Sequence, residues 1–344
     1  MKFIQAGAPH IHRARTVAAL MREVVLALLP AILLHTWFFG PGLIFNTVIA
    51  ITFALLGEAL MLRLRKQSVG LFLGDYTAVL TAVLLAFALP PLTPWWVTAS
   101  ATLFAIIVAK HLYGGLGSNI FNPAMAGYAV VLVSFPAELA LWTAPGAGMA
   151  STAPLTWYQT LTTTLTGTLP ETLTWDQITG ATPLDRVQTG LTNGEMLSEI
   201  IAGSTLSGAG ANHWIIINLA VAAGGIWLLF RKIISWHIPV ALLGALFLIA
   251  MVFRLADPDS FSSPWFHLFS GSAMAGAFFI ATDPVSAATS NQGRLIYAAG
   301  IGLLIYIIRT WGSYPDGVAF AVLLMNMLVP LIDYYCVPRT YGHR

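Results

Sequence analysis

A short polar segment carries the residue types most able to do chemistry. Residues 176–182 read Asp-Gln-Ile-Thr-Gly-Ala-Thr and lie in a Thr-rich stretch between two blocks of apolar sequence. Thr182 offers a hydroxyl group that could act as a nucleophile, and Pro183 favours an extended backbone that would present this side chain. We expect the segment to be exposed and flexible, so that an enzyme could reach it. A plain surface loop with helix-capping Thr residues is the alternative interpretation.

The composition predicts that membrane helices position this segment. Hydrophobic residues make up 57% of the 344 residues and charged residues 9%, whereas a soluble domain has about 25% charged residues. The formal net charge of +2 predicts no nucleic-acid partner. Cys336 is the one cysteine, which excludes an internal disulfide and a cysteine-ligated iron–sulfur cluster within this chain. We predict no metal site, because the eight histidines have no metal-ligand spacing.

Apolar stretches divide the chain into about ten expected transmembrane helices, which predicts an all-α integral membrane protein. The expected spans are 22–39, 43–62, 76–89, 95–109, 121–135, 213–230, 238–254, 266–282, 295–308 and 318–336. With a cytoplasmic N-terminus, most Lys and Arg residues fall on the cytoplasmic side, and Arg186, Arg254 and Arg309 fall on the other. This bias predicts that both termini are cytoplasmic and that Thr182 lies on the outer face.

The third to fifth expected spans resemble the eighth to tenth, which predicts two inverted repeats of five helices each. Each copy has a Pro-containing turn, a helix that closes with a basic residue, Lys110 or Arg309, and then a Gly-containing loop. We therefore expect a single membrane domain, 1–344. Its parts are repeat one at about 20–136, an outer-face loop at 137–211 and repeat two at about 212–338.

Two of the expected spans, 76–89 and 295–308, are shorter than a hydrocarbon core of about 30 Å requires. Pro and Gly residues near them indicate broken helices that end inside the membrane, next to a cavity. The alternative is that these residues only allow close packing between helices.

Further segments carry a resemblance to a known family. They are 8–12, 21–25, 121–125, 282–286 and 314–320. Together with 176–182, they make the chain similar to the RnfD/NqrB family over essentially its whole length. Members of that family are membrane subunits of ion-translocating NADH oxidoreductase complexes.

The resemblance implies covalent FMN. A flavin transferase would join FMN to Thr182 through a phosphoester, and the rest of the acceptor motif would be Asp176, Thr179, Gly180 and Ala181. Thr179 stands where many members have Ser, and both side chains are small and carry a hydroxyl group. The resemblance also allows a non-covalent riboflavin, which no local motif places.

The same resemblance implies a place in the Rnf complex, an ion-translocating ferredoxin:NAD⁺ oxidoreductase of the bacterial inner membrane. The chain would relay electrons there, coupled to Na⁺ or H⁺ movement, with the Thr182 loop in the periplasm. Implied partners are the other subunits, including a neighbouring covalent-flavin subunit, together with the flavin transferase and membrane lipid. We assign no catalytic residue. Because the chain has no Gly-x-Gly-x-x-Gly motif, we do not expect it to oxidise NADH alone.

Polar residues at the ends of the spans are expected to contact the ion or the flavin. These residues are Asp283, Asp316, Asn122, Lys110 and Arg309. For the two basic residues, snorkelling to lipid headgroups is the alternative. For Glu58, the expected partners are Arg63 and Arg65, which follow closely in the sequence.

A secondary transporter or channel for a small polar solute is the rival function, because an inverted repeat alone supports it equally well. The acceptor motif in 137–211 distinguishes the two functions, since a solute channel does not need one. Covalent flavin on Thr182 would therefore exclude the rival.

Overall fold

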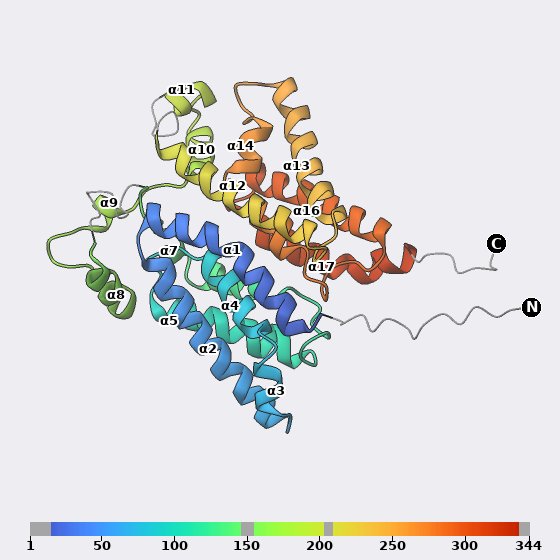
Figure 1. The fold of residues 1–344 in the computed structure, drawn as a ribbon. Coiled ribbons are helices and arrows are strands. Elements are labelled where there is room, and N and C mark those ends of the chain that lie inside the picture. The colour runs from blue at the N-terminus through green and yellow to red at the C-terminus, as the bar shows by residue number, and fades with distance from the viewer. Residues whose placement is uncertain (1–14, 146–154, 203–208, 337–344) are drawn as a thin grey trace, which may run out of the picture.

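Helices dominate the structure. The computed structural model describes residues 15–145, 155–202 and 209–336 (Figure 1). Seven of the described helices are long and apolar enough to cross a bilayer, so the chain is a multi-pass membrane protein. They are α1 (Val17–Phe39), α2 (Gly42–Leu64), α5 (Trp95–Leu103) with its π-helical continuation η1 (Phe104–Leu112), α12 (Ala209–Phe230), α13 (His237–Ala256), α16 (Asn291–Trp311) and α17 (Val318–Tyr335).

Shorter helices make up the rest of the bundle, and others form a separate group at one end of it. In the bundle they are α3 (Val69–Leu73), α4 (Thr77–Ala88), α6 (Pro123–Ser134), α7 (Pro136–Ala140), α14 (Pro264–Phe269), α15 (Ala273–Ala275) and η3 (Gly276–Ile280). The central stretch of the chain forms α8 (Trp157–Thr166), α9 (Trp175–Ile178), α10 (Pro183–Thr192) and α11 (Leu197–Ala202). In Figure 1, α8–α11 lie on the opposite side of the molecule from the start of α1 and the end of α17.

Proline residues determine where the short bundle helices begin and end. α4 ends before Pro90 and Pro91, and Leu89 takes the extended backbone that residues before a proline prefer. α6 begins with Pro123 in its first turn, and the side chain of Asn122 caps it. Both helices have 12 residues, which is too short to cross a hydrocarbon core of about 30 Å.

Two expected spans differ from the structure. The expectation of a short span at 295–308 is wrong, because α16 continues for 21 residues and Ser290 caps its start. The expected continuous span 266–282 is instead divided into α14, α15 and η3, with Gly271 at a φ of 68° between the first two. A left-handed backbone favours glycine, so the break falls at this residue.

The first half of the bundle (α1–α7) and the second half (α12–α17) pack together along α1 and α12 (Figure 1). Glycines allow the helices to approach closely. A Cβ on Gly224 of α12 would meet the backbone carbonyl of Ala27 on α1, and one on Gly302 of α16 would meet that of Leu242 on α13. Buried apolar side chains of both halves, Leu28 of α1 among them, form one continuous hydrophobic core.

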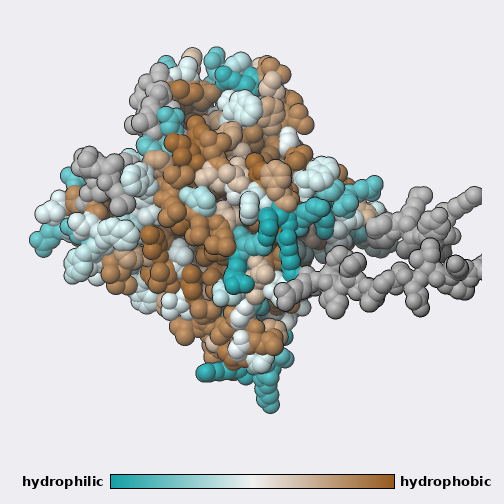
Figure 2. Space-filling model, viewed as in Figure 1, coloured by the Kyte–Doolittle hydropathy of each residue, from teal (hydrophilic) through white to brown (hydrophobic). Residues whose placement is uncertain are grey.

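The outer surface is apolar over the long helices. Figure 2 shows a broad area of hydrophobic residues, with hydrophilic residues around α8 and α9 and at the tip near α3. Large hydrophobic side chains, such as Leu33 of α1 and Val252 of α13, are exposed. Apolar side chains exposed along helices of this length are expected of a surface that faces lipid.

Candidate functional site

The acceptor motif is tied to the body of the protein. The N–H of Gly180 donates to the carbonyl of Trp142 at 2.9 Å, and the N–H of Ala144 donates to the carbonyl of Ile178 at 2.9 Å. Ile178 is buried beside these bonds. Backbone bonds and a buried side chain therefore connect this part of the motif to the body of the protein, which the expectation of an exposed, flexible segment did not include.

Thr182 caps helix α10. Its Oγ1 accepts a hydrogen bond from the N–H of Asp185 at 3.2 Å, and Pro183 occupies the first turn. The backbone of Thr182 is extended, at φ −65° and ψ 159°, as the following proline predicts. The capping role expected as the alternative is thus present. It brings a hydroxyl group to a helix N-terminus, where partial positive charge and free N–H groups favour a phosphate.

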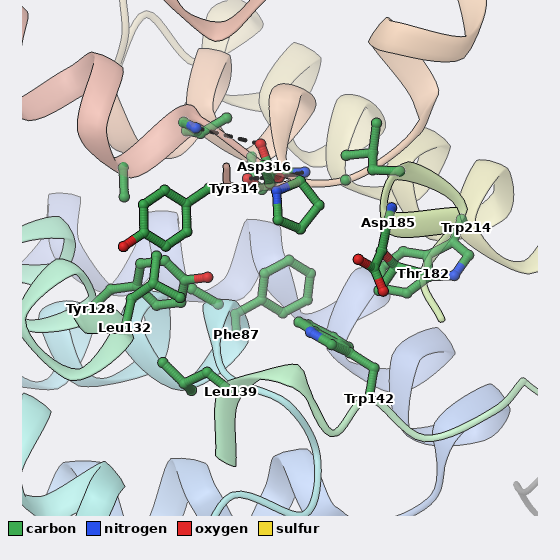
Figure 3. A pocket seen from close by; sticks show the side chains of 18 of the residues that line it. Phe87, Tyr128, Leu132, Leu139, Trp142, Thr182, Asp185, Trp214, Tyr314 and Asp316 are labelled. Carbon is green, nitrogen blue, oxygen red and sulfur yellow. Dashed lines mark hydrogen bonds between the residues drawn. The ribbon is translucent and has the colours of Figure 1, made fainter. Parts of the chain in front are cut away.

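Thr182 also lines a cavity of about 330 Å³ that takes residues from both halves of the bundle. This volume lies within the range of about 300–1,000 Å³ that is typical of small-molecule sites. Figure 3 shows aromatic side chains around the cavity. They are Phe87, Tyr128, Trp142, Trp214 and Tyr314. A set of aromatic faces of this kind suits a flat, conjugated ring.

Asp185 lies beside Thr182 at the same cavity (Figure 3). Burial raises the pKa of its carboxyl group above the usual range. The residue was not among those expected from the sequence, although a Thr followed three residues later by an acidic residue is a typical helix start. A carboxyl group that binds a proton more readily repels a neighbouring phosphate less.

Asp316 reaches the cavity from the loop before α17, and both of its oxygens are engaged. Oδ2 accepts from the N–H and the hydroxyl group of Ser272 at 2.7 and 2.6 Å, and Oδ1 accepts from Arg309 Nη2 at 3.1 Å. Arg309 is buried and also donates to the carbonyls of His267 and Ser270. The interpretation that Arg309 snorkels is therefore wrong, because these groups satisfy its charge inside the protein.

Gly271 lies where these contacts meet the cavity, and we expect Gly271→Ala to lower the midpoint of heat unfolding in detergent. A Cβ there would meet Asp316 Oδ2 at 2.7 Å and Arg309 Nη2 at 3.0 Å. The left-handed backbone adds a cost of about 1–2 kcal/mol, and overpacking adds about 1–3 kcal/mol. Gly244→Ala on α13 is the control, because a Cβ there meets no atom within 4 Å. Equal midpoints for the two variants would contradict the expectation.

A second buried cluster forms around Lys110, which is not among the residues that line the cavity. Lys110 Nζ lies 2.8 Å from both carboxylate oxygens of Glu58 and 2.9 Å from Thr77 Oγ1, and His111 Nε2 lies 3.0 Å from Glu58 Oε2. The side chains of Lys110 and Glu58 are both 3% exposed. Snorkelling of Lys110 and pairing of Glu58 with the nearby arginines are therefore both wrong. A buried charge requires a close partner of opposite sign.

Asn122 and Asp283 lie near the contact between the two halves, outside the lining of the cavity. Asn122 Nδ2 donates to the carbonyl of Ile280 at 3.2 Å, and the N–H of Asn122 donates to Asn326 Oδ1 at 3.1 Å. Asp283 Oδ2 accepts from the hydroxyl group of Ser286 at 2.8 Å. These contacts connect the start of α6 with η3 and α17, and they satisfy polar groups at the ends of short helices.

Of the expected site residues, Thr182 and Asp316 line the cavity. The remaining expected residues are not part of the cavity lining: Asp176, Thr179, Gly180, Ala181, Asn122, Lys110, Asp283 and Arg309. Asp176 and Ala181 are exposed, as access by a modifying enzyme requires. The aromatic lining and His35 were not expected from the sequence, because a lone histidine or aromatic residue in an apolar span carries no motif.

Comparison with protein families decides what the chain is related to. The model of the NQR2, RnfD, RnfE family matches residues 4–342. The chain belongs to that family. The resemblance seen in 121–125 and 314–320 is thereby confirmed for nearly the whole chain.

Relatives with a shared name match this chain over nearly their full lengths. A protein of Aliivibrio salmonicida (strain LFI1238), named as a subunit of an ion-translocating oxidoreductase complex, is 48% identical over 349 residues, which cover 100% of this chain and 99% of that protein. Proteins with the same name from two other organisms are similar. That of Alcanivorax borkumensis is 50% identical over 349 residues (100% and 98% covered), and that of Salmonella newport is 49% identical over 352 residues (100% and 99% covered).

Proposed function

We propose that this chain is the flavin-carrying membrane subunit of an ion-translocating oxidoreductase complex, with FMN attached to Thr182 as a phosphoester. The position of the Thr182 hydroxyl group carries the proposal, because it lies at a helix N-terminus and on the wall of an aromatic cavity. Membership of the family and the name shared by the relatives support a place in such a complex.

The residues around Thr182 fit FMN. The N-terminus of α10 offers backbone N–H groups to a phosphate, and Tyr128, Trp142 and Trp214 offer aromatic faces to a ring. When bound, FMN accepts and donates electrons. At the edge of the cavity, Ser272 and Arg309 hold the carboxylate of Asp316 in a fixed position.

Attachment requires a transferase that uses flavin-adenine dinucleotide. A bond forms between Thr182 Oγ1 and the phosphorus on the flavin side, the phosphoanhydride bond breaks, AMP leaves, and the hydroxyl proton is lost. Asp176 is exposed, and we propose that it contacts the transferase or its metal ion. Gly180 is not needed for packing, because a Cβ there would make only ordinary contacts with Ala144. We therefore propose that Gly180 leaves room for the transferase to approach Thr182. We propose no place for riboflavin.

In the complex, we propose that this chain relays electrons between ferredoxin and NAD⁺, coupled to Na⁺ or H⁺ movement across the bacterial inner membrane. About ten spans in two inverted repeats would place both termini in the cytoplasm and Thr182 in the periplasm. The position of α8–α11 on the opposite side of the molecule from the start of α1 and the end of α17 supports one part of this proposal, that Thr182 and the two ends of the bundle lie on opposite sides of the membrane (Figure 1).

Fluorescence of the denatured protein tests the proposal. The full-length chain would be produced with and without an active flavin transferase, separated on a denaturing gel and illuminated to excite flavin. We expect a fluorescent band only with the transferase. A dark band in the presence of a transferase that labels another acceptor would contradict the proposal and favour the solute transporter or channel.

A further inference from the structure

His35 of α1 is a buried polar side chain without a partner at the cavity. It is 2% exposed, and neither of its ring nitrogens has a hydrogen-bond partner. Its side chain lines the same cavity as Thr182. A neutral imidazole has one N–H donor and one acceptor nitrogen, and leaving both unpaired in the interior is costly. The cavity is therefore where these atoms must find a partner.

The neighbours of His35 hold its ring but do not satisfy it. The ring centroid lies 4.8 Å from that of Phe39 and 5.9 Å from that of Phe87. Apolar side chains such as Leu84 and Met125 line the same cavity. A ligand that reaches His35 therefore needs apolar faces for these walls and a polar edge for the imidazole.

We propose that His35 forms a hydrogen bond with the polar edge of the flavin ring, and this inference rests on the proposed attachment of FMN to Thr182. The isoalloxazine ring has flat apolar faces, and its pyrimidine edge carries carbonyl acceptors and an N–H donor. A neutral imidazole complements such an edge with its own donor and acceptor. His35 is a positioning residue that orients the ring and sets its redox potential.

The direction of the effect on the potential follows from charge. Reduction places electron density on the ring, and a donated hydrogen bond is stronger to a group that carries negative charge. The N–H of His35 therefore stabilises the reduced ring more than the oxidised ring. Loss of this donor lowers the midpoint potential of the bound flavin.

Redox titration of the full-length, FMN-loaded protein tests the inference. In His35→Phe and His35→Leu, we expect the equilibrium constant for reduction of the bound flavin to fall about tenfold. For a two-electron couple, this lowers the midpoint potential by about 30 mV. His35→Gln keeps a donor and an acceptor and should retain most of the potential. His267→Leu is the matched control, because His267 is also buried with an unpartnered Nδ1 but does not line this cavity.

The outcomes separate the two proposals. At least one of His35→Phe and His35→Leu must fold and take up FMN for this comparison. If the midpoint potential of that variant is unchanged, the role of His35 is overturned and the attachment to Thr182 stands. A shift of equal size in His267→Leu would also overturn the role of His35, since the effect would then be structural. A wild-type chain that takes up no covalent flavin from an active transferase would overturn both proposals.

Discussion

Thr182→Ala is expected to abolish covalent flavin while the protein still folds and inserts. The hydroxyl group of Thr182 accepts the hydrogen bond that caps α10, and loss of such a cap costs about 1 kcal/mol. A hydroxyl group is needed to form the phosphoester, and alanine has none. Flavin fluorescence on a denaturing gel and elution of the folded protein from a sizing column measure the two effects.

Two variants control for this result. Thr156→Ala removes the matching cap of α8, so it carries a similar structural cost but should keep covalent flavin. Thr182→Ser keeps a hydroxyl group and should still be labelled. Fluorescence that persists on Thr182→Ala, or that is lost equally on Thr156→Ala, would show that the flavin is attached elsewhere or that its loss follows from instability.

Glu58→Leu is expected to destabilise the protein more than most single substitutions. It leaves Lys110 and His111 without the carboxylate that lies 2.8 and 3.0 Å from them. Removing one partner of a buried ion pair costs about 3–5 kcal/mol, because the other charge remains buried. We expect a large fall in the midpoint of heat unfolding in detergent. The double variant Glu58→Leu with Lys110→Met should recover much of the loss, since the uncompensated charge is gone.

Glu23→Leu is the matched control for this second prediction. Glu23 pairs with Arg231 at 3.0 Å, but the two side chains are 23% and 43% exposed. Ion pairs exposed to water contribute little to stability, because solvent screens the charges, so this variant should shift the midpoint little. Equal shifts for Glu58→Leu and Glu23→Leu would show that the Lys110 cluster is not a buried, dry ion pair.

The sequence predicted features that local chemistry determines. The expected spans 76–89 and 121–135 lie close to α4 and α6. Pro90 and Pro91 end the first helix and Asn122 with Pro123 starts the second, because proline and capping residues act on their immediate neighbours. The extended backbone of Thr182 follows from its neighbouring proline for the same reason. The start of α16 was placed wrongly, because an apolar stretch marks the membrane core and not the helix end, where polar residues continue the helix.

The sequence did not predict contacts between residues far apart in the chain. Glu58 and Lys110 are separated by 52 positions, so a local interpretation chose arginines close to Glu58 in the sequence. The aromatic cavity combines residues of both halves, and no spacing in the sequence marks Phe87 and Trp214 as neighbours of one site. Long-range packing determines such sites, and of the cavity lining only Thr182 and Asp316 were expected from the sequence.

The mass of the peptide that contains Thr182 tests the central claim most directly. The full-length chain would be made with an active flavin transferase, digested with a protease, and its peptides fragmented in a mass spectrometer. We predict that this peptide is heavier by one FMN less one water, with the added mass on Thr182. An unmodified Thr182, found while the same transferase labels another acceptor protein, would contradict the claim.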